Sequence, residues 1–345
     1  MKNLNIQEIS DKKLWNDFIF ENTHDTFHQS WEWGDMSRKL DQRVINLGLF
    51  HQDNLVAVCL VIRIKAKRGI FLHVPHGPVF RSEVTRQELE EELNSLKNYL
   101  IKLGAEENCS FIRLAPTLGR TEENQHLFQK LGFRPAPIFV QSELSLVLDI
   151  SLTEEELLKN MRKSTRYILK RADQHQLRYM KSTDPEDFAL FYDLYKKTVQ
   201  SQEYVGHGYN FIKQEFLSFL ETNSATLYFV FDKERLLSGA IIIHQNQTGF
   251  YHYGASLKNQ TEIPSSHLLQ WYIIQDLKRA GYTQYNFWGI APNDKPTHPW
   301  KGLTVFKKGF GGVERQYLQT QDYILKWPYW LNWVIESARR IKRGY

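Results

Sequence analysis

The chain has 345 residues and carries a net charge of +5, with 42% hydrophobic and 14% aromatic residues. Chains of this length hold about two domains of roughly 100–200 residues each, and this composition can fill two cores. The composition excludes a disordered protein, and the lack of any run of about 18 apolar residues excludes a transmembrane helix. The first residues contain no apolar signal-peptide core, so we expect a cytoplasmic protein.

The cysteines and histidines give no indication of a metal or redox site. Cys59 and Cys109 each stand in an apolar, strand-like run, so we expect small buried thiols in a reducing compartment. The 12 histidines are scattered and show no metal-ligand spacing with cysteines or acids, so no metal is expected. The mildly basic balance is a weak indication of a nucleic-acid or phosphate partner.

One order of strands and helices occurs twice along the chain, at an offset of about 180 residues. Each copy has three strands in a meander, then an amphipathic helix that ends near a glycine, then a further strand. The predicted segments are 44–50, 55–64, 69–74, 86–103 and 110–114 in the first copy, and 225–231, 236–244, 249–254, 266–280 and 284–288 in the second. A repeat this long indicates two copies of one domain.

Each copy fits a mixed α+β sheet. We place the first domain at 1–148 and the second at 149–323, with the join near 141–153. The segment 324–345 lies beyond the second copy. Its apolar residues have helical spacing (Trp327, Trp330, Trp333, Val334 and Ile335), and a basic end, 339–343, follows them. We expect this helix to pack back on one domain, with a helix lying on a membrane surface as the alternative.

A basic helix is predicted to open the second domain. Thr153 and Glu156 form a capping box, and the apolar stripe consists of Leu157, Met161, Ile168 and Ala172. Between 159 and 171 the other faces carry six positive residues and no acid (Lys159, Arg162, Lys163, Arg166, Lys170 and Arg171). Like charges four residues apart disfavour a helix slightly, so this pattern indicates an anionic partner. The alternative is an ordinary solvated face.

The most informative segment lies at 286–312. It contains Asn286-Phe-Trp-Gly-Ile-Ala291, His298-Pro-Trp-Lys-Gly302 and Phe306-Lys-Lys-Gly-Phe-Gly-Gly312. We interpret it as a strand ending in a tryptophan and a glycine, a polar loop, and a glycine-rich turn with two lysines. Strand ends and glycine turns commonly hold ligands in α/β proteins, and lysines there favour anions. A surface loop with solvated lysines is the alternative.

These three motifs resemble the C-terminal signature of the Fem family of peptidoglycan cross-bridge transferases. The resemblance implies two tandem GNAT-like acyltransferase domains, with the C-terminal helix on the first. It also implies transfer of an amino acid from aminoacyl-tRNA to an amine of the stem peptide of a nucleotide-linked or lipid-linked precursor. The ester is already activated, so no cofactor is implied. Larger members insert a helical hairpin in the second domain, and this chain is similar to the compact form without it.

The resemblance also implies roles for individual residues. Phe306 and Lys307 match the family's functional pair, and Lys307 is the expected catalytic residue, either facing the oxyanion or holding a diphosphate. Lys308 aligns instead with Lys130 of the first copy and is expected to be structural. Further expected substrate contacts are Trp33, Lys39, Tyr253, His207, Trp288 and Gly289, and expected tRNA or phosphate contacts are Arg162, Lys163, Arg166 and Lys170.

Two features depart from the family pattern. Ala115 occupies the place of an acid in an R-x-x-P motif, so it cannot be a base; Asp294 and His298 are substitutes, with a turn aspartate and a surface histidine as the alternative. The family's arginine and following tyrosine are His207 and Phe211 here.

Two other classes of function stay open. An acyl-CoA-dependent N-acyltransferase would hold pyrophosphate on a glycine-rich loop, but the corresponding loops, 79–85 and 256–266, contain no glycine. A non-catalytic protein that binds RNA or the precursor would explain the basic helix but not the lysine motif.

Overall fold

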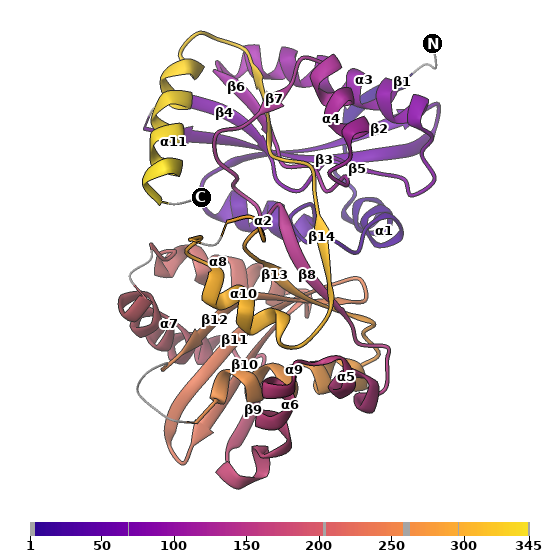
Figure 1. The fold of residues 1–345 in the computed structure, drawn as a ribbon. Helices are drawn as coiled ribbons and strands as arrows, with labels where there is room; N and C mark the ends of the chain where they lie inside the picture. The colour runs from indigo at the N-terminus through magenta and orange to yellow at the C-terminus, as the bar shows by residue number, and fades with distance from the viewer. Residues whose placement is uncertain (1–3, 68, 203–204, 258–262, 296, 344–345) are drawn as a thin grey trace. The chain divides into compact units, whose positions relative to one another are not determined.

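The computed structural model describes residues 4–67, 69–202, 205–257, 263–295 and 297–343. The chain divides into two compact units, each built on one sheet (Figure 1). Unit 1 comprises Met1–Leu144, Pro292–Pro299 and Arg315–Tyr345, and unit 2 comprises Ser145–Ala291 and Trp300–Glu314. The mixed α+β class predicted from the sequence is confirmed.

Unit 1 is an eight-stranded sheet, as counted over the described residues, with helices on both faces. Its elements are β1 (Leu4–Glu8), α1 (Lys12–Asn22), α2 (Trp31–Lys39), β2 (Arg43–His51), β3 (Asn54–Ala66), β4 (Gly69–Val74), β5 (Val79–Phe80), α3 (Arg86–Glu106), β6 (Phe111–Leu114), α4 (Glu122–Lys130), β7 (Arg134–Pro135), β15 (Gln321–Ile324) and α11 (Tyr329–Arg343). A capping box of Thr85 and Glu88 starts α3, and its leucine stripe shares one buried core with the alternate residues Ile45, Leu47 and Leu49 of β2.

Unit 2 has a seven-stranded sheet within the described part of the chain. Its elements are β8 (Leu144–Asp149), α5 (Glu154–Asn160), α6 (Lys163–Lys170), η1 (Ala172–His175), β9 (Arg178–Ser182), η2 (Pro185–Asp187), α7 (Phe188–Gln202), α8 (Tyr209–Leu220), β10 (Ala225–Asp232), β11 (Arg235–Gln245), β12 (Thr248–Ser256), α9 (Ser265–Arg279), β13 (Gln284–Gly289), α10 (Lys301–Lys308) and β14 (Val313–Gln316). The Tyr228 hydroxyl donates to Asp276 of α9. The adjacent Phe229 pairs with Gly239, which lies against Phe191 of α7, so α9 and α7 cover opposite faces.

The two sheets have the same strand order, which confirms the internal repeat. That order is β1-β2-β3-β4-β6-β15-β7 in unit 1 and β9-β10-β11-β12-β13-β8-β14 in unit 2. The pairs β4·β6 and β12·β13 are parallel, and the strand beyond each is antiparallel: β15 on β6, and β8 on β13. Each sheet thus takes one strand from outside its own copy. β15 follows the second copy in the chain, and β8 precedes it.

This exchange changes the expected domain limits. We expected 149–323 to form the second domain, but β8 from Leu144 onward lies in the second sheet, and Gln321–Ile324 lies in the first. The reason is visible at Arg113 of β6, which is directly opposite Asp322 in the β15 register. The ion pair of these two side chains ties the C-terminal strand to the first sheet.

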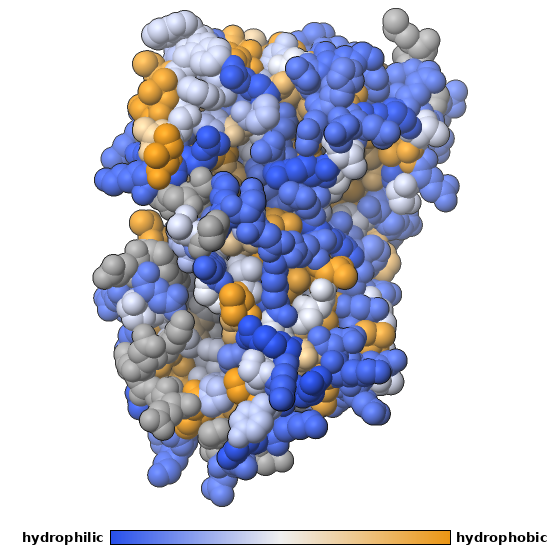
Figure 2. All heavy atoms as spheres, in the orientation of Figure 1, coloured by the Kyte–Doolittle hydropathy of each residue, from blue (hydrophilic) through white to orange (hydrophobic). Residues whose placement is uncertain are grey.

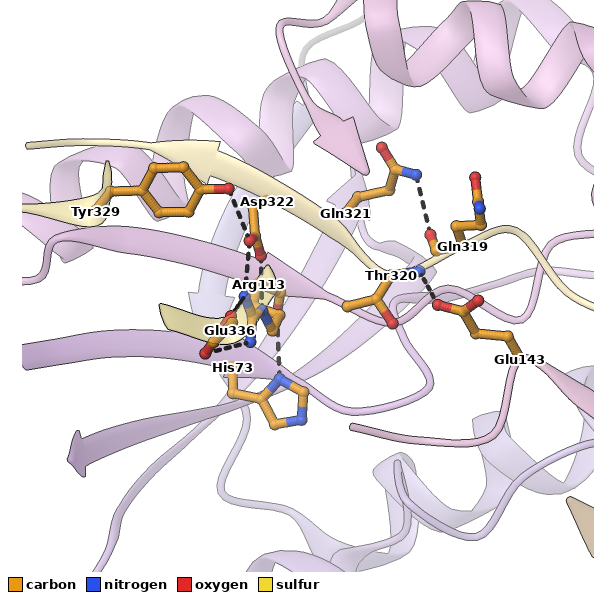
Figure 3. Close-up of polar contacts among 9 residues, drawn as sticks. All are labelled: His73, Arg113, Glu143, Gln319, Thr320, Gln321, Asp322, Tyr329 and Glu336. Carbon is orange, nitrogen blue, oxygen red and sulfur yellow. Dashed lines mark hydrogen bonds and ion pairs between the residues drawn. The ribbon is translucent and has the colours of Figure 1, made fainter. Parts of the chain in front are cut away.

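Arg113 is the centre of a buried polar network in unit 1 (Figure 3). Its guanidinium binds Asp322 through two hydrogen bonds of 2.7 and 2.8 Å and binds Glu336 of α11 at 2.8 Å. Tyr329 donates to Asp322 at 3.1 Å. Burial by itself lowers the pKa of Arg113, but the carboxylates of Asp322 and Glu336 outweigh it and raise the pKa. The network fixes β15 and α11 on β6.

The side of α11 that meets unit 1 is therefore its polar side. Asn332 and Glu336 are buried, whereas Trp330, Val334 and Ile335 are exposed. The helix packs on unit 1, and it does so through this polar side and not through its apolar residues. Cys59 and Cys109 are free and buried, as predicted. No helix among the described residues is long and apolar enough to cross a membrane.

Candidate active site

The candidate site of unit 2 lies where β12 and β13 part. The two strands pair in parallel up to Phe250 and Asn286, and both continue beyond that pair without pairing with each other. In unit 1 the corresponding strands stay paired to the end of β4, at Val74. Strands that separate leave backbone groups and side chains available for a ligand. The second copy therefore holds the better candidate.

Each of the two parting strands carries a bulge at this place. In β12, Tyr251 and Tyr253 pair with adjacent residues of β11, so His252 is the extra residue. In β13, the register against β8 shifts between Asn286 and Gly289, around Trp288. The rings of His252 and Trp288 meet edge to face, with centroids 5.9 Å apart. Bulges re-aim side chains and are frequent beside active sites.

Trp288 has a strained backbone. Its φ of 64° lies in the left-handed region, where a bulky side chain is uncommon. Its N–H donates to the Asn286 side chain at 2.8 Å. Local strain of this kind, of order 1–3 kcal/mol, clusters at functional sites.

Lys307 reaches the end of β13 from α10. Its Nζ donates to the Gly289 carbonyl at 2.7 Å and lies 5.8 Å from the centre of the Tyr251 ring. One turn earlier, the Thr304 hydroxyl accepts the Ala291 N–H at 2.8 Å. The Lys307 side chain is buried, and burial lowers its pKa to about 7. Unlike an ordinary lysine, this amine changes protonation near neutral pH.

The lysine motif is not the turn that the sequence suggested. Lys307 and Lys308 form the last turn of α10, and the turn itself consists of Gly311 and Gly312, with φ of 88° and 93°. A Cβ on Gly312 would come within 2.7 Å of the Val147 carbonyl, so glycine is needed for this close approach. Lys308 points elsewhere and pairs with Glu314 at 2.6 Å.

A buried carboxylate that the sequence analysis missed lies beside His252. Glu215 of α8 is 1% exposed, and its Oε1 is 2.6 Å from His252 Nε2. The Tyr253 hydroxyl donates to its Oε2 at 3.0 Å. His207 stacks on Phe211 and meets the Tyr253 ring at 6.1 Å, so the expected residues His207 and Tyr253 do come together. A carboxylate that orients an imidazole is an arrangement used for general base catalysis.

The side chain of Phe306 lies against His267. Its ring meets His267 edge to face at 4.8 Å. Burial, with the charge of Arg162 as a second cause, lowers the pKa of His267 to about 4. The Arg162 N–H donates to the Gly309 carbonyl at 2.9 Å. The basic segment and the end of α10 are therefore direct neighbours within unit 2.

The basic segment is two helices and not one. The capping box of Thr153 and Glu156 is present, but α5 ends at Asn160, and Arg162 is the N-cap of α6. The helix is interrupted here because the Arg162 N–H donates to the Gly309 carbonyl and not to a carbonyl of the preceding helical turn. The buried stripe consequently differs from the expected one: Leu157 and Met161 are buried, but Thr165 and Leu169 replace Ile168 and Ala172.

The positive side chains of this segment have unequal surroundings. Arg166 is half-buried and donates to the carbonyls of Leu158 and Lys159, at 3.2 and 2.9 Å, so it caps α5. Lys163 and Lys170 are exposed. An open hollow of about 600 Å³ is lined by Arg162, Lys163, Ser164, Tyr167 and Ile168. Lys163 and Lys170 remain accessible to an anionic partner.

The remaining expected residues lie in unit 1. Trp33 is buried against Phe27, at 5.9 Å, and Lys39 is exposed in the last turn of α2. Asp294 is exposed and His298 is buried, and both lie in Pro292–Pro299, which belongs to unit 1. Of the loop 256–266, residues 258–262 lie outside the described part of the chain. Among the described residues, no group of three or more His, Cys, Asp or Glu could hold a metal ion.

Two sheets of one strand order, each with a parallel central pair, define a tandem GNAT-like protein. A tandem GNAT protein from the clavulanic acid biosynthesis pathway has this fold, with a TM-score of 0.57 and 9% identity over 94% of this chain and 99% of that one. The crystal structure of FemX matches more fully, with a TM-score of 0.82 and 16% identity over 96% of this chain and 100% of the other.

The chain belongs to the FemAB family, whose model matches residues 11–231 and 223–329. A protein of Staphylococcus saprophyticus named lipid II:glycine glycyltransferase is 30% identical over 103 residues. One of Staphylococcus aureus with the same name is 29% identical over 103 residues. In both cases the match covers 30% of this chain and 24% of the other protein, so the chain spans about a quarter of the length of these relatives.

Proposed function

We propose that this protein transfers an amino acid from aminoacyl-tRNA to an amine of the stem peptide of a peptidoglycan precursor, as a step in building the interpeptide bridge. Membership of the FemAB family and relatives named lipid II:glycine glycyltransferase support this class of reaction. The observation that carries the proposal is the buried amine of Lys307 at the end of β13, bonded to Gly289 and with a pKa lowered to about 7.

The reaction makes three demands on the site. The acceptor amine attacks the ester carbonyl, the ester C–O bond breaks, and the tRNA hydroxyl leaves with a proton, so an amide replaces the ester. The site must align both substrates, accept the proton that the attacking amine loses, and stabilise the tetrahedral oxyanion. We propose that the Lys307 ammonium meets the oxyanion, since a charge held in a dry site acts strongly there.

His252 is the proton acceptor in this proposal. The Glu215 Oε1 lies 2.6 Å from the His252 Nε2, and an imidazole beside a carboxylate is suited to take up a proton. The exposed Lys163 and Lys170, with Arg162, are the proposed contacts for the tRNA backbone or the precursor's diphosphate. Because charged tRNA is a cytoplasmic substrate, we place the reaction in the cytoplasm.

The test is direct transfer, read by mass spectrometry. The purified protein is incubated with individual charged tRNAs and with nucleotide-linked and lipid-linked precursors. The expected product is a precursor heavier by one amino-acid residue. Acylation from acyl-CoA, with no transfer from any charged tRNA, would contradict the proposal.

Two variants locate the chemistry. Lys307→Ala should lower kcat by about 10²–10³-fold, the range measured when one donor to an oxyanion is removed. Lys308→Ala is the matched control on the next residue, and it should stay close to the parent because Lys308 pairs with Glu314. His252→Gln should reduce the rate by about 10²–10⁴-fold. Equal activities of the two lysine variants, both stably folded, would refute the role of Lys307.

A further inference from the structure

The C-terminal helix α11 is inverted relative to an ordinary surface helix. Surface helices bury an apolar stripe and expose charge. In α11 the buried side consists of Tyr329, Asn332 and Glu336, which are 0%, 7% and 9% exposed. Tyr329 and Glu336 both bind the Arg113–Asp322 network (Figure 3). Hydrogen bonds and an ion pair hold the polar side of the helix to unit 1, so its apolar side faces away from this contact.

The outer side of α11 carries exposed apolar side chains from its first turn to its last. Leu331, Val334 and Ile341 are 56%, 59% and 77% exposed, and Trp330 is 40% exposed. Trp327, just before the helix, is 70% exposed. Positions 330, 334 and 341 differ by four and seven residues and so lie in one line along the helix. Figure 2 shows orange side chains over α11. A continuous apolar face of this kind indicates an interaction surface.

The charge on this surface has one sign. Arg339, Arg340 and Lys342 are exposed in the second half of α11. Glu336 is the sole acid in the sequence of the helix, and it is buried against Arg113. The accessible surface therefore combines tryptophan, aliphatic side chains and positive charge. Tryptophan prefers the boundary between lipid and water, and arginine and lysine favour anionic headgroups.

We propose that α11, together with Trp327, binds the surface of an anionic phospholipid bilayer, with the helix lying in the plane of the interface. The 15 residues of α11 extend about 22 Å, so the helix lies on the bilayer and does not cross it. An anionic bilayer offers the charge opposite to Arg339, Arg340 and Lys342. A second copy of the chain would instead bring the same positive charges to the same interface.

The inference rests on the proposed function in one respect, namely that a lipid-linked acceptor gives membrane binding its purpose. Membrane binding itself needs neither acceptor nor tRNA. The full-length protein is mixed with vesicles of phosphatidylcholine, with or without about one third phosphatidylglycerol, and the bound fraction is measured by flotation. Binding to the anionic vesicles and weak binding to the neutral ones are expected.

Three variants separate the contributions. Replacing Arg339, Arg340 and Lys342 with glutamine should weaken binding by roughly 100-fold, since each charge near the surface contributes about fivefold. Replacing Leu331, Val334 and Ile341 with glutamine should weaken it by about tenfold or more, because their apolar area no longer enters the lipid. Glutamine keeps helix propensity, and none of the six side chains is buried.

The control carries three glutamines at exposed apolar positions outside α11. Phe20, Val140 and Val205 are 55%, 50% and 88% exposed. Their replacement should leave vesicle binding unchanged. Equal binding by the parent, the control and both α11 variants would overturn the inference. So would a parent that ignores vesicles but forms a dimer in sedimentation velocity that the apolar variant loses, because the partner would then be a second copy.

The outcomes also separate this inference from the proposed function. Transfer to a nucleotide-linked acceptor in solution requires no membrane. A protein that performs this transfer but ignores anionic vesicles overturns the inference alone. A protein that binds the vesicles through α11 but transfers no amino acid from any charged tRNA overturns the proposed function alone.

Discussion

Replacing Lys307 with methionine should stabilise the protein while strongly lowering the rate of transfer. Burial lowers the pKa of this lysine from 10.5 to about 7, so the folded chain holds its proton less tightly than the unfolded chain. Between those two values the unfolded state binds more protons, and stability therefore rises with pH. The free-energy penalty for burying the charged Lys307 amine is fully present below about pH 7 and absent above about pH 10.5.

The size of the effect follows from the shift. At about 1.4 kcal/mol per pKa unit, the buried amine costs on the order of 4 kcal/mol at neutral pH. Its hydrogen bond to the Gly289 carbonyl offsets about 1 kcal/mol, and leaving that carbonyl without a donor costs a similar amount. Lys307→Met keeps the unbranched shape and should raise the free energy of unfolding by roughly 2 kcal/mol at pH 7.

Urea denaturation at pH values from about 6 to 10 measures this gain. The gap between Lys307→Met and the parent should shrink steadily as pH rises. Lys308→Met is the control: its parent side chain is partly exposed and paired with Glu314, so the change should stay below about 1 kcal/mol. A Lys307→Met protein that is less stable than the parent at pH 7, or a gap that does not change with pH, would refute the reasoning.

Three further outcomes are expected. Arg113→Leu leaves the buried Asp322 carboxylate without its partner and should lower the free energy of unfolding by about 3–5 kcal/mol in urea, and Asp322→Leu in the same chain should restore most of it. Arg166→Gln should lower the free energy of unfolding by about 1 kcal/mol, because the cap of α5 is lost. Lys170→Gln should leave stability unchanged, and the slope of log tRNA affinity against log salt concentration should fall by about 0.7–0.9 for the one contact removed. Glu215→Gln should lower kcat, and an unchanged kcat would show that this carboxylate does not orient a catalytic imidazole.

The regular elements of this fold could be predicted from local patterns. The strand at Gly69–Val74 has the predicted bounds, and α9 begins and ends within one residue of the predicted helix. Alternation, helical spacing and punctuation by glycine are local properties, and the repetition of the same order twice reinforced each prediction. The break after Asn160 could not be predicted in this way, because it depends on the bond from Arg162 to Gly309, which is distant in sequence.

The candidate site likewise combines features that local patterns predict with features that depend on contacts distant in sequence. The motif predicted a role for Lys307, but the burial of this lysine and its bond to Gly289 come from the packing of α10 on the strand end. Glu215 was missed although it is an isolated acid in an apolar helix, and that isolation was the available signal. His252 owes its position to a bulge, and a bulge is set by the register of two strands. Likewise, the spacing of α11 defined an apolar face but could not show which way it points.

The exchange of strands between the two copies has a consequence for synthesis on the ribosome. The first sheet lacks the strand between β6 and β7 until Gln321–Ile324 has been made. The second sheet already has its borrowed strand, β8, before β13 emerges. The N-terminal half is therefore translated first but completed last. A gene truncated after residue 144 would encode a sheet with an open position at β6, which exposes unpaired backbone groups.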